Sequence, residues 1–302
     1  MSDSFSHIVM SNSLPSFEEI NVSTKTFITV TNLTINILQM HEELPLAPYI
    51  ETPRQRGKKS PTPEPDPNAH LIDGSIITSE CEGRVRGASS RRKKSHFRNS
   101  VTIVMIVAGK KINFKVSRNG KMQMTGCKED AHTISCIQYF WEVLQTMPHN
   151  YELNGDHFEA IIVPAMRNVD FRLGFSVNRQ NLDRYINTST EFHSLLETSV
   201  GYAGVNIKLP VEVPFEDIPL CKLVCEGGRW VEHSVPYSEY LDTLKPREKQ
   251  KKLEKEHHNT FLVFASGSAI CSGRDFASTK PSYDKFAKII EACKDRITIP
   301  EV

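Results

Sequence analysis

Residues 111–128 have the sequence KINFKVSRNGKMQMTGCK. Apolar and polar side chains alternate on both sides of Asn119-Gly120, which is typical of two β-strands that each have one buried and one open face. Asn-Gly is the strongest short signal for a two-residue hairpin turn, because both central residues of that turn need a positive φ. After Gly126 a helix is expected, with apolar residues at helical spacing: Cys136, Ile137, Phe140, Trp141 and Leu144. The stretch therefore predicts a strand–turn–strand–helix unit.

The same pattern occurs near the C-terminus, where residues 261–273 have the sequence FLVFASGSAICSG. A second helix is expected after it, with apolar residues at Tyr283, Phe286, Ile289, Ile290 and Cys293. Gly120 and Gly267 are 267 − 120 = 147 positions apart, and several other pairs keep that offset: Gly126/Gly273, Phe114/Phe261, Val116/Val263 and Thr125/Ser272. Repetition at a fixed offset indicates a duplicated module, and two copies are too few for a solenoid. We therefore predict a pseudo-two-fold pair of half-domains.

These motifs resemble the TATA-binding protein family, in a divergent form like those of large nucleocytoplasmic DNA viruses. The family's half-repeat ends in a strand, Phe-x-x-Gly-Lys, a strand, Thr-Gly-x-Lys and a long helix. Residues 120–128 match the first copy, and residues 264–267 with Ser272-Gly273 match the second. The resemblance extends from about Val22 to the last helix. It implies an α+β fold in which two half-repeats, each a curved antiparallel sheet with helices on its convex side, form one saddle.

The composition limits the class of protein. The chain has 302 residues, of which 39% are hydrophobic, and a net charge of +1, so any DNA-binding face must be local. Seven cysteines without paired spacing fit a reducing intracellular compartment. The N-terminus does not resemble a signal peptide, and no apolar run is long enough to cross a bilayer. We expect a soluble intracellular protein of the nucleus, a viral factory or the virion.

The domain organisation follows from the repeat and from two interruptions. Residues 1–18 are polar and are expected to form a flexible tail, followed by half-repeats at 19–150 and 151–302. A proline-rich and then basic insertion occupies about 45–95, and its composition cannot bury enough apolar surface to order fully. A second insertion occupies about 210–258 and ends in a mixed-charge run typical of a solvated helix.

The resemblance implies that the concave sheet face lies along the DNA minor groove, while apolar wedges enter base steps and kink the duplex. The family has a pair of wedge phenylalanines in each half, and the matching positions here are Phe97, Ser117, Tyr202 and Phe264. Ser117 leaves one wedge missing, and the hydroxyl of Tyr202 makes deep insertion costlier. The alternative is that Phe97, Tyr202 and Phe264 are ordinary aromatic residues on a buried strand face.

The groove floor of the family is lined by small and apolar residues with two central asparagines. The matching floor positions here are Lys115, Gln123, Thr125, Leu262, Ile270 and Ser272. The asparagine positions fall near Phe27 and Pro164 and cannot be filled without a gap. Because the minor groove mainly distinguishes A·T from G·C, this loss predicts an altered or relaxed sequence preference.

Phosphate contacts are expected from cations near the ends of the strands. The candidates are Lys121, Lys128 and Lys208, and the basic cluster Arg91, Arg92, Lys93 and Lys94. Ser268 and Asp275 replace cations in the second copy. The cluster has three interpretations that the sequence leaves open: phosphate tracking, a nuclear localisation signal, or a solvated linker.

Catalysis has little support in the sequence. Cys127, His132 and Cys136 have a spacing that resembles metal ligands, and Cys221 and Cys225 form another pair, but neither set matches a standard zinc site. We interpret these cysteines as core residues. No phosphate-binding glycine loop and no nucleophile elbow occur, so no catalytic residue, metal or cofactor is expected.

The leading hypothesis is therefore a transcription initiation factor resembling the TATA-binding protein. It would bind and bend double-stranded promoter DNA, A/T-rich by analogy, and recruit RNA polymerase and a transcription factor IIB-like protein, without a membrane or a small-molecule substrate. The alternative is a protein-docking scaffold in a transcription complex that has weak or no DNA binding, motivated by Ser117, Lys115 and the missing asparagines. A third hypothesis is an enzyme acting on DNA bases or strands, since glycosylases can carry a related repeat. It would need a catalytic acid or lysine in a pocket, and the sequence has no such constellation.

Overall fold

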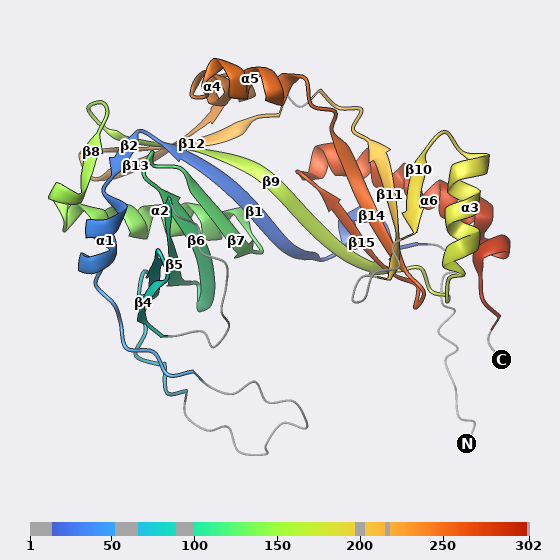
Figure 1. Ribbon diagram of the computed structural model, residues 1–302, viewed down its shortest axis with the longest axis horizontal. Coiled ribbons are helices and arrows are strands. Elements are labelled where there is room, and N and C mark those ends of the chain that lie inside the picture. Colours follow the sequence, from blue (N-terminus) through green and yellow to red (C-terminus); the bar gives the residue numbers. More distant parts are fainter. Residues whose placement is uncertain (1–13, 52–65, 89–98, 197–202, 215–217, 301–302) are drawn as a thin grey trace, which may run out of the picture. The chain divides into compact units, whose positions relative to one another are not determined.

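The chain folds into two compact units, each with its own hydrophobic core (Figure 1). Figure 1 shows the computed structural model of the protein. The structure describes residues 14–51, 66–88, 99–196, 203–214 and 218–300. We name residues 24–165 and 216–250 the first-repeat unit, and residues 1–23, 166–215 and 251–302 the second-repeat unit. No helix among the described residues is long and apolar enough to span a membrane.

The first-repeat unit is built on an antiparallel sheet in the order β1–β7–β6–β5–β3–β4. Helix α1 contacts β3 and β5, whereas α2 contacts β5 and β7. A small two-stranded sheet pairs β2 with β8. The bounds are β1 (Val22–Thr31), β2 (Leu33–Ile35), α1 (Ile37–Glu43), β3 (Ile76–Cys81), β4 (Arg84–Gly87), β5 (Ser100–Val107), β6 (Lys110–Ser117), β7 (Met122–Cys127), α2 (Asp130–Gln145), η2 (Pro148–Asn150) and β8 (Tyr151–Leu153).

The second-repeat unit has the same topology. Its antiparallel sheet runs in the order β9–β15–β14–β11–β10, with α3 against β10 and β11 and α6 against β15 and β11. The bounds are η1 (Phe17–Glu19), β9 (Phe158–Arg172), α3 (Arg179–Ser189), β10 (His193–Leu196), β11 (Gly204–Pro210), β14 (His258–Phe264), β15 (Ser268–Gly273) and α6 (Phe276–Ile297). Residues 158–165 of β9 belong to the first-repeat unit. Strand by strand, β1, β3, β5, β6 and β7 correspond to β9, β10, β11, β14 and β15. The predicted α+β class with two similar half-repeats is confirmed.

Alternation along the strands gives each sheet a face that packs on helices and a face that does not. In β6, Phe114 is fully buried and meets Phe140 of α2 edge-on, with ring centroids 5.4 Å apart. In β14, the equivalent Phe261 is also fully buried and stacks on Phe286 of α6 at 4.3 Å. Burial of aromatic rings on one side of the sheet fixes the strand register, because a slip by one residue would expose them.

The hairpin turns differ from the predicted two-residue type. Gly120 has a φ of +69°, but Asn119 is not among the described non-glycine residues with positive φ. The Gly120 amide donates to the Ser117 carbonyl at 3.0 Å, and the Ser117 amide donates to the Lys121 carbonyl at 2.9 Å. The prediction was therefore wrong: the loop has three residues and its glycine is left-handed, the next commonest hairpin connection. Gly267 repeats this turn: its φ is +74°, and its amide donates a hydrogen bond to the Phe264 carbonyl at 3.0 Å.

The N-terminal tail and the first insertion contain more structure than their composition predicts. Phe17 is 1% exposed and packs against Tyr283 with ring centroids 5.2 Å apart, so the described end of the predicted tail is not loose. Within the predicted insertion at 45–95, β3 and β4 form strands, and β3 buries Ile76 and Cys81 in the core. Burying these apolar side chains offsets the cost of ordering the segment.

The second insertion belongs to the first-repeat unit over residues 216–250, although the sequence places it within the second half-repeat. It forms a hairpin of β12 (Leu220–Glu226) and β13 (Arg229–Val235), in which Cys221 of β12 pairs with Ile162 of β9. Helix α4 (Tyr237–Asp242) follows, and α5 (Pro246–Leu253) has no buried residue, as predicted for a solvated helix. Lys222 ties the insertion to β9, since its Nζ lies 2.9 Å from carboxylate oxygens of both Glu159 and Glu239.

Candidate nucleic-acid interface

The first-repeat sheet has a solvent-facing side opposite its core, which we name the first open face. Cross-strand pairing builds it in two rows: Thr26, which is buried, Thr125 and Asn113 in one, and Ile28, Gln123 and Lys115 in the other. Gln123 and Thr125 are exposed, whereas their strand neighbours Met122 and Met124 are fully buried. The predicted floor residues Lys115, Gln123 and Thr125 therefore share one face. It offers hydroxyl and amide groups, one cation and one aliphatic side chain.

The second-repeat sheet has an equivalent side, which we name the second open face. One row across the strands consists of Asp170, Ile270, Leu262, Asn206 and Leu195; the other consists of Asn168, Ser272, Thr260, Lys208 and His193. The predicted floor residues Leu262, Ile270 and Ser272 lie here together, each partly exposed. This face is more apolar than the first, and Asp170 brings a carboxylate into it.

Phe264 lies at the end of the second open face, at the base of the β14–β15 turn. It pairs with Gly204 of β11 and is partly exposed, whereas Phe261 and Val263 of the same strand are fully buried. Phe264 belongs to neither hydrophobic core, which favours the wedge over the core interpretation. At the matching place on the first open face, Ser117 pairs with Ser100, so no large side chain stands there. The other predicted wedges, Phe97 and Tyr202, lie outside the described residues.

Cations border both open faces. Lys208 is exposed within the second open face, Lys128 is exposed just after β7, and Lys121 is partly exposed just before it. The cluster Arg91, Arg92, Lys93 and Lys94 lies outside the described residues. Asp275, which stands in place of a cation, caps helix α6: its Oδ1 accepts a hydrogen bond from the Ser278 amide at 2.9 Å.

Sequence analysis missed several polar residues of the second open face, among them Asn168 and Arg172. Asn168 pairs with Ser272, and its Oδ1 is buried without a hydrogen-bond partner among the described residues. Arg172 is exposed and pairs with Ser268, so it supplies a cation where the sequence comparison found none. Both residues could have been found from the alternation of polar and apolar residues over 168–172. Val169 and Phe171 are apolar and buried, so Asn168 and Arg172 lie on the opposite face of the strand.

The cysteines and the histidine whose spacing resembles metal ligands lie in or beside the first core. Burial raises the pKa of the Cys127 and Cys136 thiols, and both side chains are fully buried in the first core. His132 accepts a hydrogen bond from the Lys128 amide at 3.3 Å. A serine–histidine pair does occur, with His41 Nδ1 2.7 Å from Ser79 Oγ, but both residues are buried in the sheet–helix layer. No group of metal-ligating side chains gathers within the described parts of the chain.

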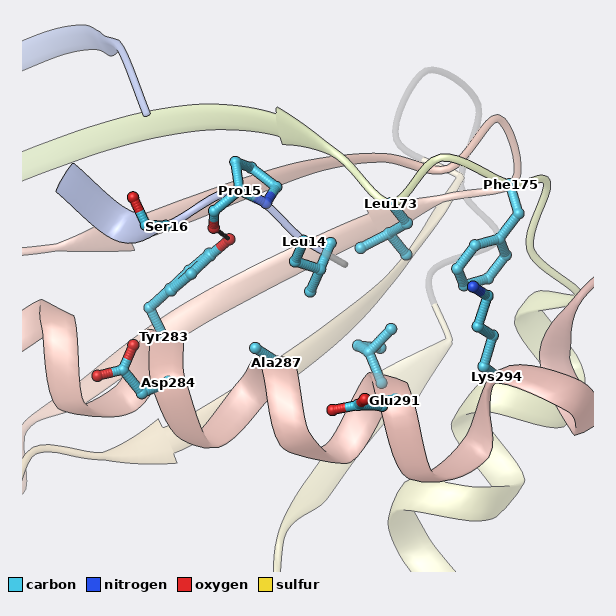
Figure 2. Close-up of a pocket in the computed structure, with 11 residues that line it drawn as sticks. Leu14, Pro15, Ser16, Leu173, Phe175, Tyr283, Asp284, Ala287, Glu291 and Lys294 are labelled. Atoms are coloured by element: carbon cyan, nitrogen blue, oxygen red, sulfur yellow. Dashed lines mark hydrogen bonds between the residues drawn. The ribbon is translucent and has the colours of Figure 1, made fainter. Parts of the chain in front are cut away.

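A groove lies on the helix side of the second-repeat unit (Figure 2). It has a volume of about 520 Å³ and runs along α6 between residues 14–16 and residues 173–175. The hydroxyl of Tyr283 donates to the Pro15 carbonyl at 2.7 Å and closes one end. Its wall and floor are mostly apolar, with Asp284, Glu291 and Lys294 at the rim, and Ala287 lines it between them. The groove can accept an apolar side chain flanked by charges.

Comparisons with known proteins found similarities that extend over nearly the whole chain. An uncharacterized protein, 335L, of Invertebrate iridescent virus 6 is 24% identical over 295 residues, which cover 93% of this chain and 86% of the viral protein. Among solved structures, TBP of Methanococcus jannaschii is similar with a TM-score of 0.46 and 13% identity, covering 91% of this chain and 98% of that chain. No family model matches the chain.

Proposed function

We propose that this chain is a transcription initiation factor like the TATA-binding protein, which binds and bends double-stranded promoter DNA through its two open faces. The observation that carries the proposal is the partly exposed Phe264 at the end of a strand whose other aromatic ring is buried in the core. A large rigid apolar side chain kept out of the core and beside a floor of aliphatic and polar side chains is suited to entering a base step.

The chemistry of the open faces supports a minor-groove ligand. Aliphatic side chains such as Leu262 and Ile270 fill a groove without needing hydrogen bonds, and amides such as Asn168 and Gln123 can donate to the acceptors of A·T pairs. Lys121, Lys128, Lys208 and Arg172 would contact phosphates. Since the chain's net charge is only +1, these local cations have to supply the electrostatic part of binding.

The proposal extends to partners and place of action. RNA polymerase and a transcription factor IIB-like protein would dock on the helices and insertions, and the chain would act without catalysis, in the nucleus or in a viral factory or virion. Similarity to an iridescent-virus protein supports a role in a large DNA virus.

Replacing Phe264 with alanine is expected to weaken duplex binding about tenfold or more, since an aromatic–base stack is worth about 1–3 kcal/mol. The bend angle of the bound duplex should fall as well, because the wedge that holds the kink is removed. Affinity is measured by gel shift and bending by energy transfer between dyes at the duplex ends. Phe276→Ala is the matched control: Phe276 is 44% exposed but lies at the start of α6, on the helix side. Full binding and bending by Phe264→Ala would contradict the proposal.

A second candidate function, a protein-docking scaffold, is favoured by the groove along α6. Its apolar floor and the carboxylates of Asp284 and Glu291 fit a partner segment that inserts one large apolar side chain beside a lysine or arginine.

Peptides selected from a displayed random library for binding to this groove should carry that pattern. They should bind the Ala287→Leu variant about tenfold more weakly, because the added side chain fills the groove. Ala292→Leu is the control, since Ala292 is exposed on α6 and does not line the groove. Equal losses for both variants would rule out the groove as the docking site.

A further inference from the structure

Asp170 is a carboxylate at the β9 end of one row of the second open face. It lies in β9 between the buried residues Val169 and Phe171, which point into the core, so its own side chain points to the open side. Across the sheet it pairs with Ile270, whose other neighbour is Leu262. The side chain is exposed. An ionised group therefore stands beside an aliphatic floor, at a position where the proposed function brings the edges of bases.

The hydrogen-bonding capacity of Asp170 is mostly unused. Its Oδ1 accepts a hydrogen bond from the Ser23 hydroxyl at 3.2 Å, and no described lysine, arginine or histidine forms an ion pair with it. An ionised carboxylate has about four acceptor sites and no donor. The group thus presents acceptors, and only acceptors, toward whatever lies on the second open face.

The fold does not require a carboxylate at this position. In the first-repeat unit the equivalent position is Ile28, which pairs with Gln123 just as Asp170 pairs with Ile270. Gln123 and Ile270 are themselves related by the 147-residue offset. Each unit therefore has one aliphatic and one polar side chain at this pair of positions. The aliphatic residue is in β1 in the first-repeat unit and in β15 in the second-repeat unit. Isoleucine at this site is compatible with the same topology.

We propose that Asp170 recognises the 2-amino group of guanine in the minor groove, an inference that rests on the proposed function. The minor-groove edge of an A·T pair presents only the acceptors adenine N3 and thymine O2, whereas a G·C pair adds the guanine N2 amino donor. A carboxylate is repelled by the former and forms a charge-assisted hydrogen bond with the latter. The second open face would therefore select a G·C pair at one position of the DNA site. This differs from a site in which every position prefers an A·T pair.

The test compares duplexes that differ only in the amino group. A duplex selected from a random pool is rebuilt with each G·C pair replaced in turn by inosine·C, which lacks the 2-amino group and leaves the rest of the pair unchanged. At one position, the wild-type protein should bind the G·C duplex about tenfold more tightly than the inosine duplex, the discrimination expected of one good base contact. Replacing an A·T pair at that position by 2,6-diaminopurine·T, which adds the amino group, should restore binding.

Variants of Asp170 assign the discrimination to the carboxylate. Asp170→Ile copies the first-repeat unit and should bind the G·C and inosine duplexes equally, with higher affinity for an all-A·T duplex because a negative charge is removed. Asp170→Asn keeps an acceptor without the charge and should retain part of the preference. Asp295→Asn removes an exposed carboxylate from the helix side, at α6, and should bind like the wild type.

The outcomes separate this inference from the proposed function. If wild-type protein binds DNA but no position distinguishes guanine from inosine, recognition by Asp170 is wrong and DNA binding stands. If Asp170→Ile and Asp170→Asn are folded and keep the full preference, another group recognises the amino group and the inference is also wrong. If no duplex is bound at all, the proposed function fails first. Thermal unfolding of each variant verifies that it is folded. If Asp170→Ile does not fold, the test uses Asp170→Asn, which is nearly isosteric with the wild-type residue.

Discussion

Replacing Phe261 with alanine is expected to lower the free energy of unfolding by about 3–5 kcal/mol. The ring is fully buried in the second core and stacks on Phe286 with centroids 4.3 Å apart and planes 5° apart. Removing it loses the transfer free energy of a large apolar group and leaves a cavity that a sheet packed on a helix cannot close completely. Urea denaturation followed by fluorescence and circular dichroism measures the change.

The matched control for Phe261 is Phe264→Ala in the same strand. Phe264 is three residues further along β14, hence on the opposite side, and it belongs to neither core. Its replacement is expected to change the free energy of unfolding by about 1 kcal/mol at most, the range of substitutions outside the core. If Phe264→Ala destabilises the protein as much as Phe261→Ala does, the ring is a core group and the second open face is wrongly assigned.

This pair of phenylalanines also marks how far sequence alone predicts the fold. Period-two alternation and the 147-residue offset identify β6 with β14, β7 with β15, and the helices that follow them. The correspondence of β3 with β10 is not visible in the sequence, because β3 lies within a proline-rich and basic segment whose average composition hides six strand residues. Its pairing with β5 is a long-range contact, and composition carries no information about such contacts.

The candidate site was predicted where the repeat was regular and missed where a strand changes phase. In β9 the core-facing residues are Phe158, Ala160 and Ile162 at even positions, and then Val169 and Phe171 at odd positions. The change of phase lies between Ile162 and Val169, a stretch that contains Pro164, which has no amide proton to donate to a ladder. An alignment that assumes one alternation along the whole strand places the family's second asparagine position near Pro164. It therefore does not identify Asn168.

The place of the second insertion could not be predicted for a different reason. Lys222 of β12 bonds to Glu159 of β9 and Glu239 of α4, on the side of β9 opposite Ala160. Nothing local in residues 216–250 indicates β9 as their partner, because the partner is a sheet edge created by folding. The hairpin of β12 and β13 extends that edge and joins the insertion to the first-repeat unit.

The second large effect is expected from Gly267→Ala, which should destabilise the protein by about 3 kcal/mol, a sum of backbone strain and overlap. Gly267 has a φ of +74°, and a Cβ atom built on it would lie 2.0 Å from the Phe175 carbonyl oxygen. The contact is with backbone, so no side-chain rotation can relieve it. Gly120→Ala in the first-repeat unit should behave alike, since its Cβ would lie 2.5 Å from the Leu33 carbonyl oxygen.

Gly109→Ala separates the two causes of that loss. Gly109 has a φ of +68°, similar to Gly267, but nothing lies within 4 Å of a Cβ built on it. Its replacement should therefore cost only the strain of a left-handed residue, about 1 kcal/mol. Equal losses for Gly109→Ala and Gly267→Ala would mean that the close approach of the turn to Phe175 does not exist. The comparison is made by thermal and urea unfolding of the three alanine variants.

The close approach also connects stability to the proposed DNA contact. The amides of Leu173 and Val177 each donate to a carbonyl of the β14–β15 turn, from Gly267 and Ala265, at 2.8 Å. These bonds hold the turn against residues 173–177, and Phe264 stands at the base of that turn. A displaced turn would move the ring away from the end of the second open face. Gly267→Ala is therefore expected to weaken duplex binding even under conditions where the variant is fully folded, whereas Gly109→Ala should leave binding unchanged.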